Sequence, residues 1–382
     1  AAASGAPDIL WSKKAHTEAV NNLAYSTDSN TLVSACNVIR VWNATTGVLK
    51  LTFDHPATAL AFAPDNDTLA TSYLEYDSDS EKVIPVIRLW NISTEMNTEA
   101  LLGHDSSVIS LAFSPNGKQM ASGDNKYDTL LWEVSNLDEP HVYSFYSNAL
   151  AFSPDSAWLA GAGESNTARL WKTATHQMIG MGAYPIANAV AYSPDGSSLL
   201  VGGKTPPGID SVPGVQTAGV IKVYRVSDRE VLANMRVTND EVTCMAVHPD
   251  GDKVIAGYKT AKIRIWDLET FEISKEFDEE TGTASGDEPG VRSIAISPNG
   301  KYFAYGRNDG KVVVAQWPDD STTEGETGEG ETEGEGEIDW GTLLSCVQQT
   351  DDTADKTAAF AGDGAFLAML TGALWLGRRF RR

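Results

Sequence analysis

The segment Val190-Ala191-Tyr192-Ser193-Pro194-Asp195 leads from a short apolar strand into a tight turn, and this pattern occurs seven times along the chain. A second strand follows each turn, and a third strand then ends in an aromatic residue in most copies. The copies are spaced by roughly 40 to 55 residues, so each predicts one blade of a repeat fold. The turns are Ser26-Thr27-Asp28, Ala63-Pro64-Asp65, Ser114-Pro115-Asn116, Ser153-Pro154-Asp155, Ser193-Pro194-Asp195, His248-Pro249-Asp250 and Ser297-Pro298-Asn299.

The third strands alternate β-branched or aliphatic residues with polar ones and end at one fixed aromatic position. A recurring aromatic at one place indicates a packing requirement that these blades share. These strands are Ile39-Arg40-Val41-Trp42, Ile87-Arg88-Leu89-Trp90, Leu130-Leu131-Trp132, Ala168-Arg169-Leu170-Trp171, Ile221-Lys222-Val223-Tyr224 and Ile263-Arg264-Ile265-Trp266.

Residues 8–317 resemble the WD-repeat β-propeller family, whose blades carry a Gly-His near the start and a Trp-Asp at the end of the third strand. Gly103-His104 opens blade 3, His16 stands at the corresponding place in blade 1, and Trp266-Asp267 is a literal Trp-Asp. The resemblance implies an all-β, seven-bladed β-propeller of four-stranded antiparallel blades.

In that family a His, a turn Asp, a Ser or Thr and the Trp form a buried hydrogen-bonded tetrad. Aligned by position, the turn Asp is replaced by Lys126, Ser165 and Thr260 in blades 3, 4 and 6. It is kept as Asp309 in blade 7, where the Trp is replaced by Ala315. We therefore expect no blade to build the whole tetrad.

The seventh repeat supplies only three strands before the composition changes. The segment 7–12 precedes blade 1 and has the length of an outer strand, so we expect it to complete blade 7 and cover an otherwise open edge.

The formal net charge of −23 argues against a nucleic-acid partner, because phosphate binding needs a basic face. A protein with a basic surface, or cations, would suit this charge better. Cys36 and Cys244 fall in blades that are not neighbours, which makes a disulfide between them improbable.

Composition predicts three segments: a propeller over 1–318, an acidic linker of Glu, Gly and Thr over 319–340, and a C-terminal sorting or membrane segment over 341–382. In the last segment, an apolar run from Gly364 to Gly377 is followed by an arginine-rich stretch. This order resembles the tripartite C-terminal sorting signals of bacterial surface proteins. The residues expected to carry the signal are Cys346, Gly362, Gly364, Arg378, Arg379, Arg381 and Arg382.

The arginines are expected on the cytoplasmic side of a membrane, which would place the propeller outside the cytoplasm, exported or at the cell surface. The membrane contact could be transient, since the helix could be removed by processing. A tail anchor or a core-packed amphipathic helix is the alternative. The small residues Ala1 to Gly5 are typical of a signal-peptidase product or of an artificial boundary.

The sequence contains no constellation of catalytic residues. It lacks a Gly-x-Ser-x-Gly elbow, a His-x-His metal pair and a phosphate-binding glycine loop. We therefore expect neither a cofactor nor an enzymatic activity. The alternative is an extracytoplasmic propeller enzyme, such as a metal-dependent hydrolase, with carboxylates or histidines in the central channel.

Three connections are long: 73–85 in blade 2, 204–219 in blade 5, and 278–289 between blades 6 and 7. All three emerge on one face because successive strands alternate in direction, so we expect a protein partner to bind there. The Asp77-x-Asp79-x-Glu81 spacing is a weak signal for a Ca²⁺ site, because the glycine turn and following glutamate of an EF-hand loop are missing, and a solvated acidic loop is favoured. The candidate partner-binding residues are Tyr73, Tyr76, Asp77, Asp79, Glu81, Pro206, Pro207, Ile209, Val212, Asp278, Glu279 and Glu280.

These observations together predict a non-catalytic protein-interaction scaffold, displayed on a bacterial cell surface or exported. The partner and the oligomeric state stay open.

Overall fold

The computed structural model describes residues 3–4, 6–98, 100–163, 167–183, 186–205, 218–278 and 290–318. The chain divides into two units, Ala1–Gln349 and Thr350–Arg382, and every described residue belongs to the first. The predicted linker (319–340) and C-terminal segment (341–382) therefore lie outside the described residues. Among the residues that the structure describes, no helix is long and apolar enough to cross a membrane.

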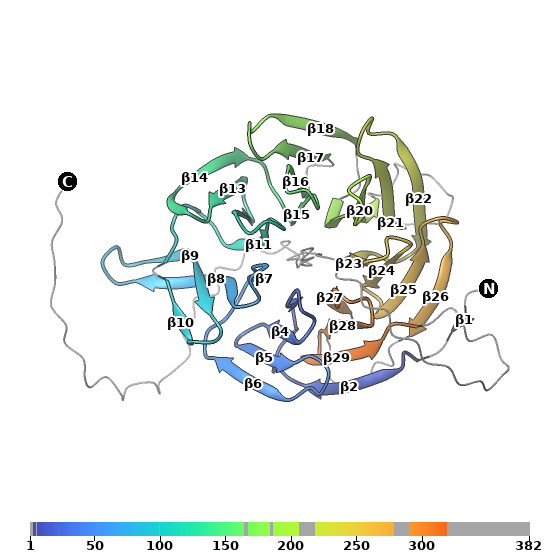
Figure 1. The fold of residues 1–382 in the computed structure, drawn as a ribbon, viewed down its shortest axis with the longest axis horizontal. Coiled ribbons are helices and arrows are strands. Elements are labelled where there is room, and N and C mark those ends of the chain that lie inside the picture. Colours follow the sequence, from blue (N-terminus) through green and yellow to red (C-terminus); the bar gives the residue numbers. More distant parts are fainter. Residues whose placement is uncertain are drawn as a thin grey trace. The chain divides into compact units, whose positions relative to one another are not determined.

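Seven sheets form a ring in which each sheet is one blade, and the first two strands of each blade lie on its inner side (Figure 1). The innermost strands are β3 (Asn22–Tyr25), β7 (Ala59–Phe62), β11 (Val108–Phe113), β15 (Ala149–Phe152), β19 (Ile186–Tyr192), β23 (Val242–Val247) and β27 (Val291–Ile296). The second strands are β4 (Thr31–Ala35), β8 (Thr68–Asp77), β12 (Gln119–Asp124), β16 (Trp158–Ala162), β20 (Ser198–Thr205), β24 (Lys253–Tyr258) and β28 (Tyr302–Arg307). These seven pairs define blades 1 to 7.

The third and outer strands complete each antiparallel blade. The third strands are β5 (Ile39–Asn43), β9 (Lys82–Asn91), β13 (Asp128–Glu133), β17 (Thr167–Lys172), β21 (Ala218–Arg225), β25 (Lys262–Asp267) and β29 (Lys311–Gln316). The outer strands of blades 1 to 6 are β6 (Leu49–Phe53), β10 (Met96–Asn97), β14 (Asn136–Ser144), β18 (Met178–Ala183), β22 (Val231–Thr238) and β26 (Ile273–Asp278). The predicted seven-bladed, all-β propeller is thereby confirmed.

The outer strand of blade 7 comes from the other end of this unit. Strand β2 (Ile9–Lys14) pairs antiparallel with β29, so the expectation that the N-terminal segment completes blade 7 is confirmed, with the strand two residues further along than predicted. Trp11 of β2 is buried and donates its indole N–H to the Ala44 carbonyl at 2.8 Å. A short additional strand, β1 (Ala3–Ser4), pairs parallel with β26 of blade 6.

The core is divided among the interfaces between blades. Each of the seven buried clusters draws its residues from two neighbouring blades, including the pair formed by blades 7 and 1. A single blade therefore cannot bury its own apolar faces, and the ring must close to be stable.

Hydrogen bonds near the inner strands also link each blade to the next. In every case a short polar side chain donates to a main-chain carbonyl of the following blade. The seven links are Asn22 to Thr58, Ser72 to Val108, Ser110 to Ser147, Asn148 to Ala187, Asn188 to Val242, Thr243 to Val291 and Ser293 to Val20. Together they run once around the ring.

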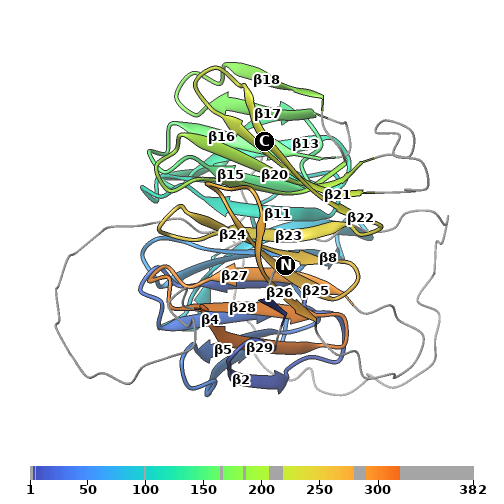
Figure 2. The same ribbon diagram turned by 90° about the vertical axis from the view of Figure 1, so that its right-hand side faces the viewer.

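The ring has two unlike faces, and its strands run from one to the other (Figure 2). The turns between first and second strands lie on what we call the short-turn face. The connections between second and third strands, and between blades, lie on the opposite or long-loop face. Each short turn is held by its own side chains; in blade 5, the Ser193 hydroxyl and the Ser197 N–H both donate to the Asp195 carboxylate.

Candidate functional site

The long connection of blade 2 is a β-hairpin. Strands β8 and β9 are both ten residues long, and their pairing continues to Asp77 opposite Lys82, so that residues 78–81 alone form the turn. The long connection predicted over 73–85 therefore consists mostly of paired strand, with only residues 78–81 in the turn. Alternation of side chains on both sides of the turn favoured a hairpin, and the cluster of acidic and serine residues obscured it. The hairpin extends away from the ring (Figure 1).

One face of this hairpin is apolar and exposed. Leu74 lies opposite Pro85, and Tyr76 lies opposite Val83. Leu74, Tyr76 and Val83 are 48%, 65% and 59% exposed. Neighbouring strand residues alternate between faces, so these four side chains share one side. We call them the hairpin patch.

The other face of the hairpin is structural. Tyr73 is buried, stacks on His55 and accepts a hydrogen bond from Arg88 Nε at 2.6 Å. Arg88 also pairs with Glu75, with Nη2 and Oε2 2.9 Å apart. The structure thus places Tyr73 in the packing of blade 2, while Tyr76 is available at the surface.

The acidic turn uses Asp77 for its own conformation. The Asp79 N–H donates to Asp77 Oδ1 at 3.1 Å, and the Ser80 hydroxyl donates to Oδ2 at 2.6 Å. These hydrogen bonds, that of Ser80 above all, hold the pKa of Asp77 below its ordinary value. Asp79 and Glu81 are exposed, and no group of three or more His, Cys, Asp or Glu side chains suited to a metal occurs among the described residues.

Of the remaining candidate residues, the structure describes only Asp278. Asp278 ends β26 and pairs with Lys262, with Nζ and Oδ1 3.0 Å apart. The others lie outside the described residues; they are Pro206, Pro207, Ile209, Val212, Glu279, Glu280, Cys346, Gly362, Gly364, Arg378, Arg379, Arg381 and Arg382.

Blade 3 does build a complete buried tetrad, contrary to expectation. The Ser122 hydroxyl contacts His104 Nε2 at 2.7 Å and accepts the Trp132 indole N–H at 2.8 Å, while His104 Nδ1 lies 3.3 Å from Asp124 Oδ2. Asp124 is two strand residues beyond Ser122 and so faces the same side, whereas Lys126 lies in the exposed turn. Alignment by the turn position therefore selected the wrong residue.

We predict that Asp124→Ala lowers the free energy of unfolding by about 2–3 kcal/mol, because it leaves His104 and the N–H groups of Lys126 and Asp128 without their acceptor. Lys126→Ala is the control, and its exposed side chain should change stability by less than about 0.5 kcal/mol. Urea denaturation of both variants measures the difference. Equal destabilisation of the two would show that Asp124 has no special role.

Blade 1 keeps three members of the tetrad and replaces the fourth with a thiol. Ser34 joins His16 Nε2 and the Trp42 indole, and Cys36 Sγ lies 3.3 Å from His16 Nδ1, where blade 3 has Asp124. Burial, together with the positive charge of Arg40, lowers the pKa of His16 from 6.5 to about 4. His16 is therefore neutral in the folded protein at physiological pH.

Stability should accordingly decline in acid through His16. In the unfolded chain His16 takes up a proton near pH 6.5, but in the folded protein only near pH 4. The contribution of neutral His16 to stability is therefore fully present above pH 6.5 and is lost as the pH falls from 6.5 to 4. The loss attributable to His16 is at most about 3 kcal/mol. Urea midpoints at pH 7 and pH 4.5 for wild type and His16→Asn test this, since the variant should lose less stability in acid. Identical pH dependence would contradict the prediction.

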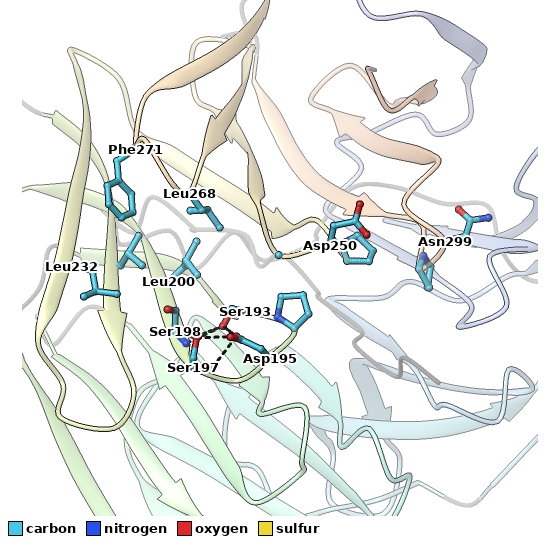
Figure 3. Close-up of a pocket in the computed structure, with 15 residues that line it drawn as sticks. Ser193, Asp195, Ser197, Ser198, Leu200, Leu232, Asp250, Leu268, Phe271 and Asn299 are labelled. Atoms are coloured by element: carbon cyan, nitrogen blue, oxygen red, sulfur yellow. Dashed lines mark hydrogen bonds between the residues drawn. The ribbon is translucent and has the colours of Figure 1, made fainter. Parts of the chain in front are cut away.

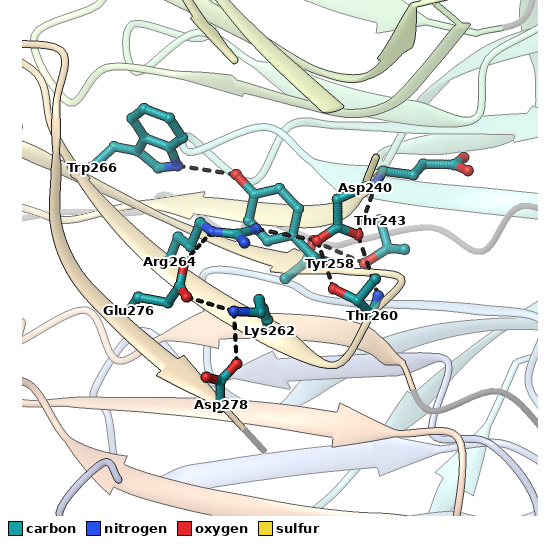
Figure 4. Close-up of polar contacts among 11 residues, drawn as sticks. Asp240, Thr243, Tyr258, Thr260, Lys262, Arg264, Trp266, Glu276 and Asp278 are labelled. Carbon is teal, nitrogen blue, oxygen red and sulfur yellow. Dashed lines mark hydrogen bonds and ion pairs between the residues drawn. The ribbon is translucent and has the colours of Figure 1, made fainter. Parts of the chain in front are cut away.

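Blade 6 replaces the tetrad with a charged network (Figure 4). Asp240 and Arg264 are both buried, with Oδ2 and Nη1 3.2 Å apart, and Arg264 Nε also pairs with Glu276 Oε2 at 2.6 Å. The Arg264 guanidinium lies 4.3 Å from the centre of the Tyr258 ring, and Tyr258 accepts the Trp266 indole N–H at 3.0 Å. Sequence reasoning missed this network.

A spacing rule could have found it. Asp240 and Thr260 are 20 residues apart, as are His104 and Asp124 in blade 3. Tyr258 precedes Trp266 by 8 residues, as Ser34 precedes Trp42. Asp240, Tyr258 and Thr260 therefore occupy the tetrad positions of the His, the Ser and the Asp, while the tryptophan is kept as Trp266.

Comparison with known proteins agrees with this architecture. The family model described as WD domain, G-beta repeat matches residues 8–43, 96–131, 139–172, 230–267 and 279–314. Most of these segments begin at the outer strand of one blade and end in the third strand of the next. The blades without a match are blade 2, whose second and third strands are each ten residues long, and blade 5, whose second and third strands are separated by residues 206–217.

Individual relatives are distant. The WD repeat-containing protein WDS homolog of Arabidopsis thaliana is 25% identical over 54% of this chain and 37% of its own length. The small ribosomal subunit protein RACK1 of Caenorhabditis elegans is 26% identical over 38% of this chain and 44% of its own length. The nuclear distribution protein PAC1 of Arthroderma benhamiae is 24% identical over 67% and 60%, respectively. The chain thus spans less than two thirds of each of these relatives.

Proposed function

The chain belongs to the WD-repeat β-propeller family, and we propose that it is a non-catalytic scaffold that binds a protein partner on the long-loop face, through the hairpin patch of blade 2. WD-repeat proteins act as protein-interaction scaffolds. The observation that carries the proposal is the exposed apolar side of the hairpin, formed by Leu74, Tyr76, Val83 and Pro85. An exposed tyrosine among aliphatic residues is typical of the centre of a protein interface.

The edges of the hairpin add a second means of recognition. Strand β7 pairs with β8 only as far as Ser72, and in the described part of the chain no strand pairs with β8 beyond that residue except β9. The outer half of the hairpin therefore presents main-chain groups that an extended partner segment can pair with.

A scaffold is supported over the rival hydrolase by the inner strands. The seven strands β3, β7, β11, β15, β19, β23 and β27 contain no carboxylate and no histidine. A metal-dependent hydrolase with its site in the channel would need several such side chains projecting from different blades.

The test uses a photo-crosslinking residue at position 76 of the full chain, with the same residue at position 127 as control. Tyr127 is also an exposed tyrosine, 73% exposed, in the connection after β12 on the long-loop face. The protein captured at position 76 is then purified, and its affinity is measured for wild type, for Tyr76→Ser/Val83→Ser and for Tyr127→Ser. We expect the hairpin variant to weaken binding at least about tenfold, equivalent to about 1.4 kcal/mol, and Tyr127→Ser to leave binding unchanged. Equal affinities, or capture of a second copy of the chain alone, would contradict the proposal.

We further propose that the propeller works outside the cytoplasm, exported or displayed on a bacterial cell surface. The support is sequence: an apolar run over 364–377 followed by four arginines, beyond an acidic linker. Fractionation of the source cells with intact-mass measurement tests this. A surface protein that has lost the C-terminal segment is expected, and a full-length cytoplasmic species would contradict export.

A further inference from the structure

A groove crosses the short-turn face, opposite the hairpin patch (Figure 3). Its volume is about 730 Å³. Three successive blades contribute to it: the turn around Asp195 in blade 5, Asp250 in blade 6 and Asn299 in blade 7. Neither the sequence motifs nor the proposed use of the long-loop face accounts for this groove.

One end of the groove is apolar. Leu200 and Leu232 of blade 5 lie there with Leu268 and Phe271 of blade 6 (Figure 3). Leu232 belongs to the outer strand β22 and is 37% exposed. An apolar side chain of a ligand could therefore be covered from two blades at once.

Phe271 reaches this end from the turn between the third and outer strands of blade 6. Its φ of 59° lies in the left-handed region, as do those of the corresponding turn residues of blades 1, 2, 4 and 5, which are Gly47, Glu95, His176 and Arg229. The backbone conformation is thus shared by five blades, and blade 6 differs in carrying an aromatic side chain there, which packs beside the core of blades 5 and 6 and lines the groove.

The other part of the groove is acidic. Asp195 and Asp250 are the ionisable side chains among the lining residues, and neither is matched by a lysine or arginine of the lining. Burial opposes ionisation of Asp195, but hydrogen bonds from Ser193 and Ser197 outweigh it and lower the pKa of Asp195 below its ordinary value. Asp250 is 80% exposed in its side chain, so its charge is available to a ligand.

We propose that this groove binds a segment of a partner protein that carries an apolar side chain close to an arginine or lysine. The apolar residue would lie among Leu200, Leu232 and Phe271, and the basic residue would face Asp195 and Asp250. The charge of the groove, within a chain of net charge −23, selects a basic segment over an acidic one. Together with the hairpin patch, the groove gives the scaffold one binding surface on each face.

The probes are fluorescein-labelled peptides of glycine and serine that contain one Phe and one Arg, separated by one to four residues. Anisotropy with the full chain measures their affinity. We expect a peptide of at least one spacing to bind, and its affinity to fall about tenfold when Arg is replaced by Glu. Its affinity should also fall several-fold in 0.5 M salt, because salt screens the exposed carboxylates of the acidic half. Failure of every spacing to bind, or equal binding of the Glu peptides, would overturn the proposal.

Matched variants locate the binding. Leu232→Ser should lower the affinity for the peptide at least about fivefold. Val231→Ser should leave it unchanged, because Val231, the preceding residue of the same strand, is 43% exposed but lies outside the groove. Asp250→Asn should weaken it, while Asp105→Asn in the loop before β11 on the long-loop face should not. Equal effects within either pair would overturn the assignment to the groove. Tyr76→Ser/Val83→Ser separates the two surfaces: it should leave peptide binding unchanged, and a loss would assign the peptide to the hairpin patch instead.

Discussion

Replacing Asp240 with alanine is expected to lower the free energy of unfolding by about 3–5 kcal/mol, because it leaves the buried Arg264 guanidinium with only one of its two carboxylate partners. Asp240 also accepts hydrogen bonds from the main chain and the hydroxyl of Thr260, which fix the turn between β24 and β25. Urea or guanidinium denaturation at neutral pH measures the loss.

Asp278→Ala is the control for the same network. Its side chain is 63% exposed and pairs with Lys262, so its removal should cost less than about 1 kcal/mol. The double variant Asp240→Ala/Arg264→Met removes the buried charge together with its partner and should recover part of the stability lost in Asp240→Ala. If Asp240→Ala were no more destabilising than Asp278→Ala, the network would contribute little to the fold.

Removing residues 1–14 is expected to destabilise the propeller by more than about 4 kcal/mol. The deletion takes away Trp11, and truncation of a buried tryptophan alone typically costs about 3–5 kcal/mol. It also uncovers the edge of β29 and one side of the cluster that contains Val312 and Val314. Thermal unfolding measures the effect, and an exposed edge should also promote aggregation.

Deletion of residues 1–5 alone provides the comparison. It removes β1, which makes only two pairings with β26, and keeps β2 intact. A loss below about 1 kcal/mol is expected, since short terminal strands contribute little. Similar unfolding of the two truncated proteins would mean that β2 is not needed to close the ring.

Much of the fold was predictable because seven copies of one pattern report the same structure. The turns from Asp28 to Asn299 and the aromatic at the end of the third strand identified the blades, and the missing strand of blade 7 identified the role of residues 7–12. These features depend on local turn chemistry and strand alternation, which a sequence displays directly.

The polar interior was less predictable because it depends on which side of a strand a residue faces. Lys126 occupies the aligned position, yet it is Asp124 that reaches His104. Asp124 lies on the inward side of β12, whereas Lys126 lies in the exposed turn that follows. The blade 2 hairpin and the groove at Asp250 were likewise not predicted from the sequence. The hairpin depends on pairing between strands, and the groove depends on how the turns of three successive blades approach one another.

The seven hydrogen bonds that link neighbouring blades bear on how the copies have diverged. Every donor is an asparagine, serine or threonine, while every acceptor is a main-chain carbonyl, which any residue type supplies. A substitution of the acceptor residue therefore leaves the acceptor of this link in place. The same kind of link therefore joins blades whose interiors differ: blade 3 is centred on His104, blade 6 on Arg264, and blade 7 has Ala315 in place of tryptophan.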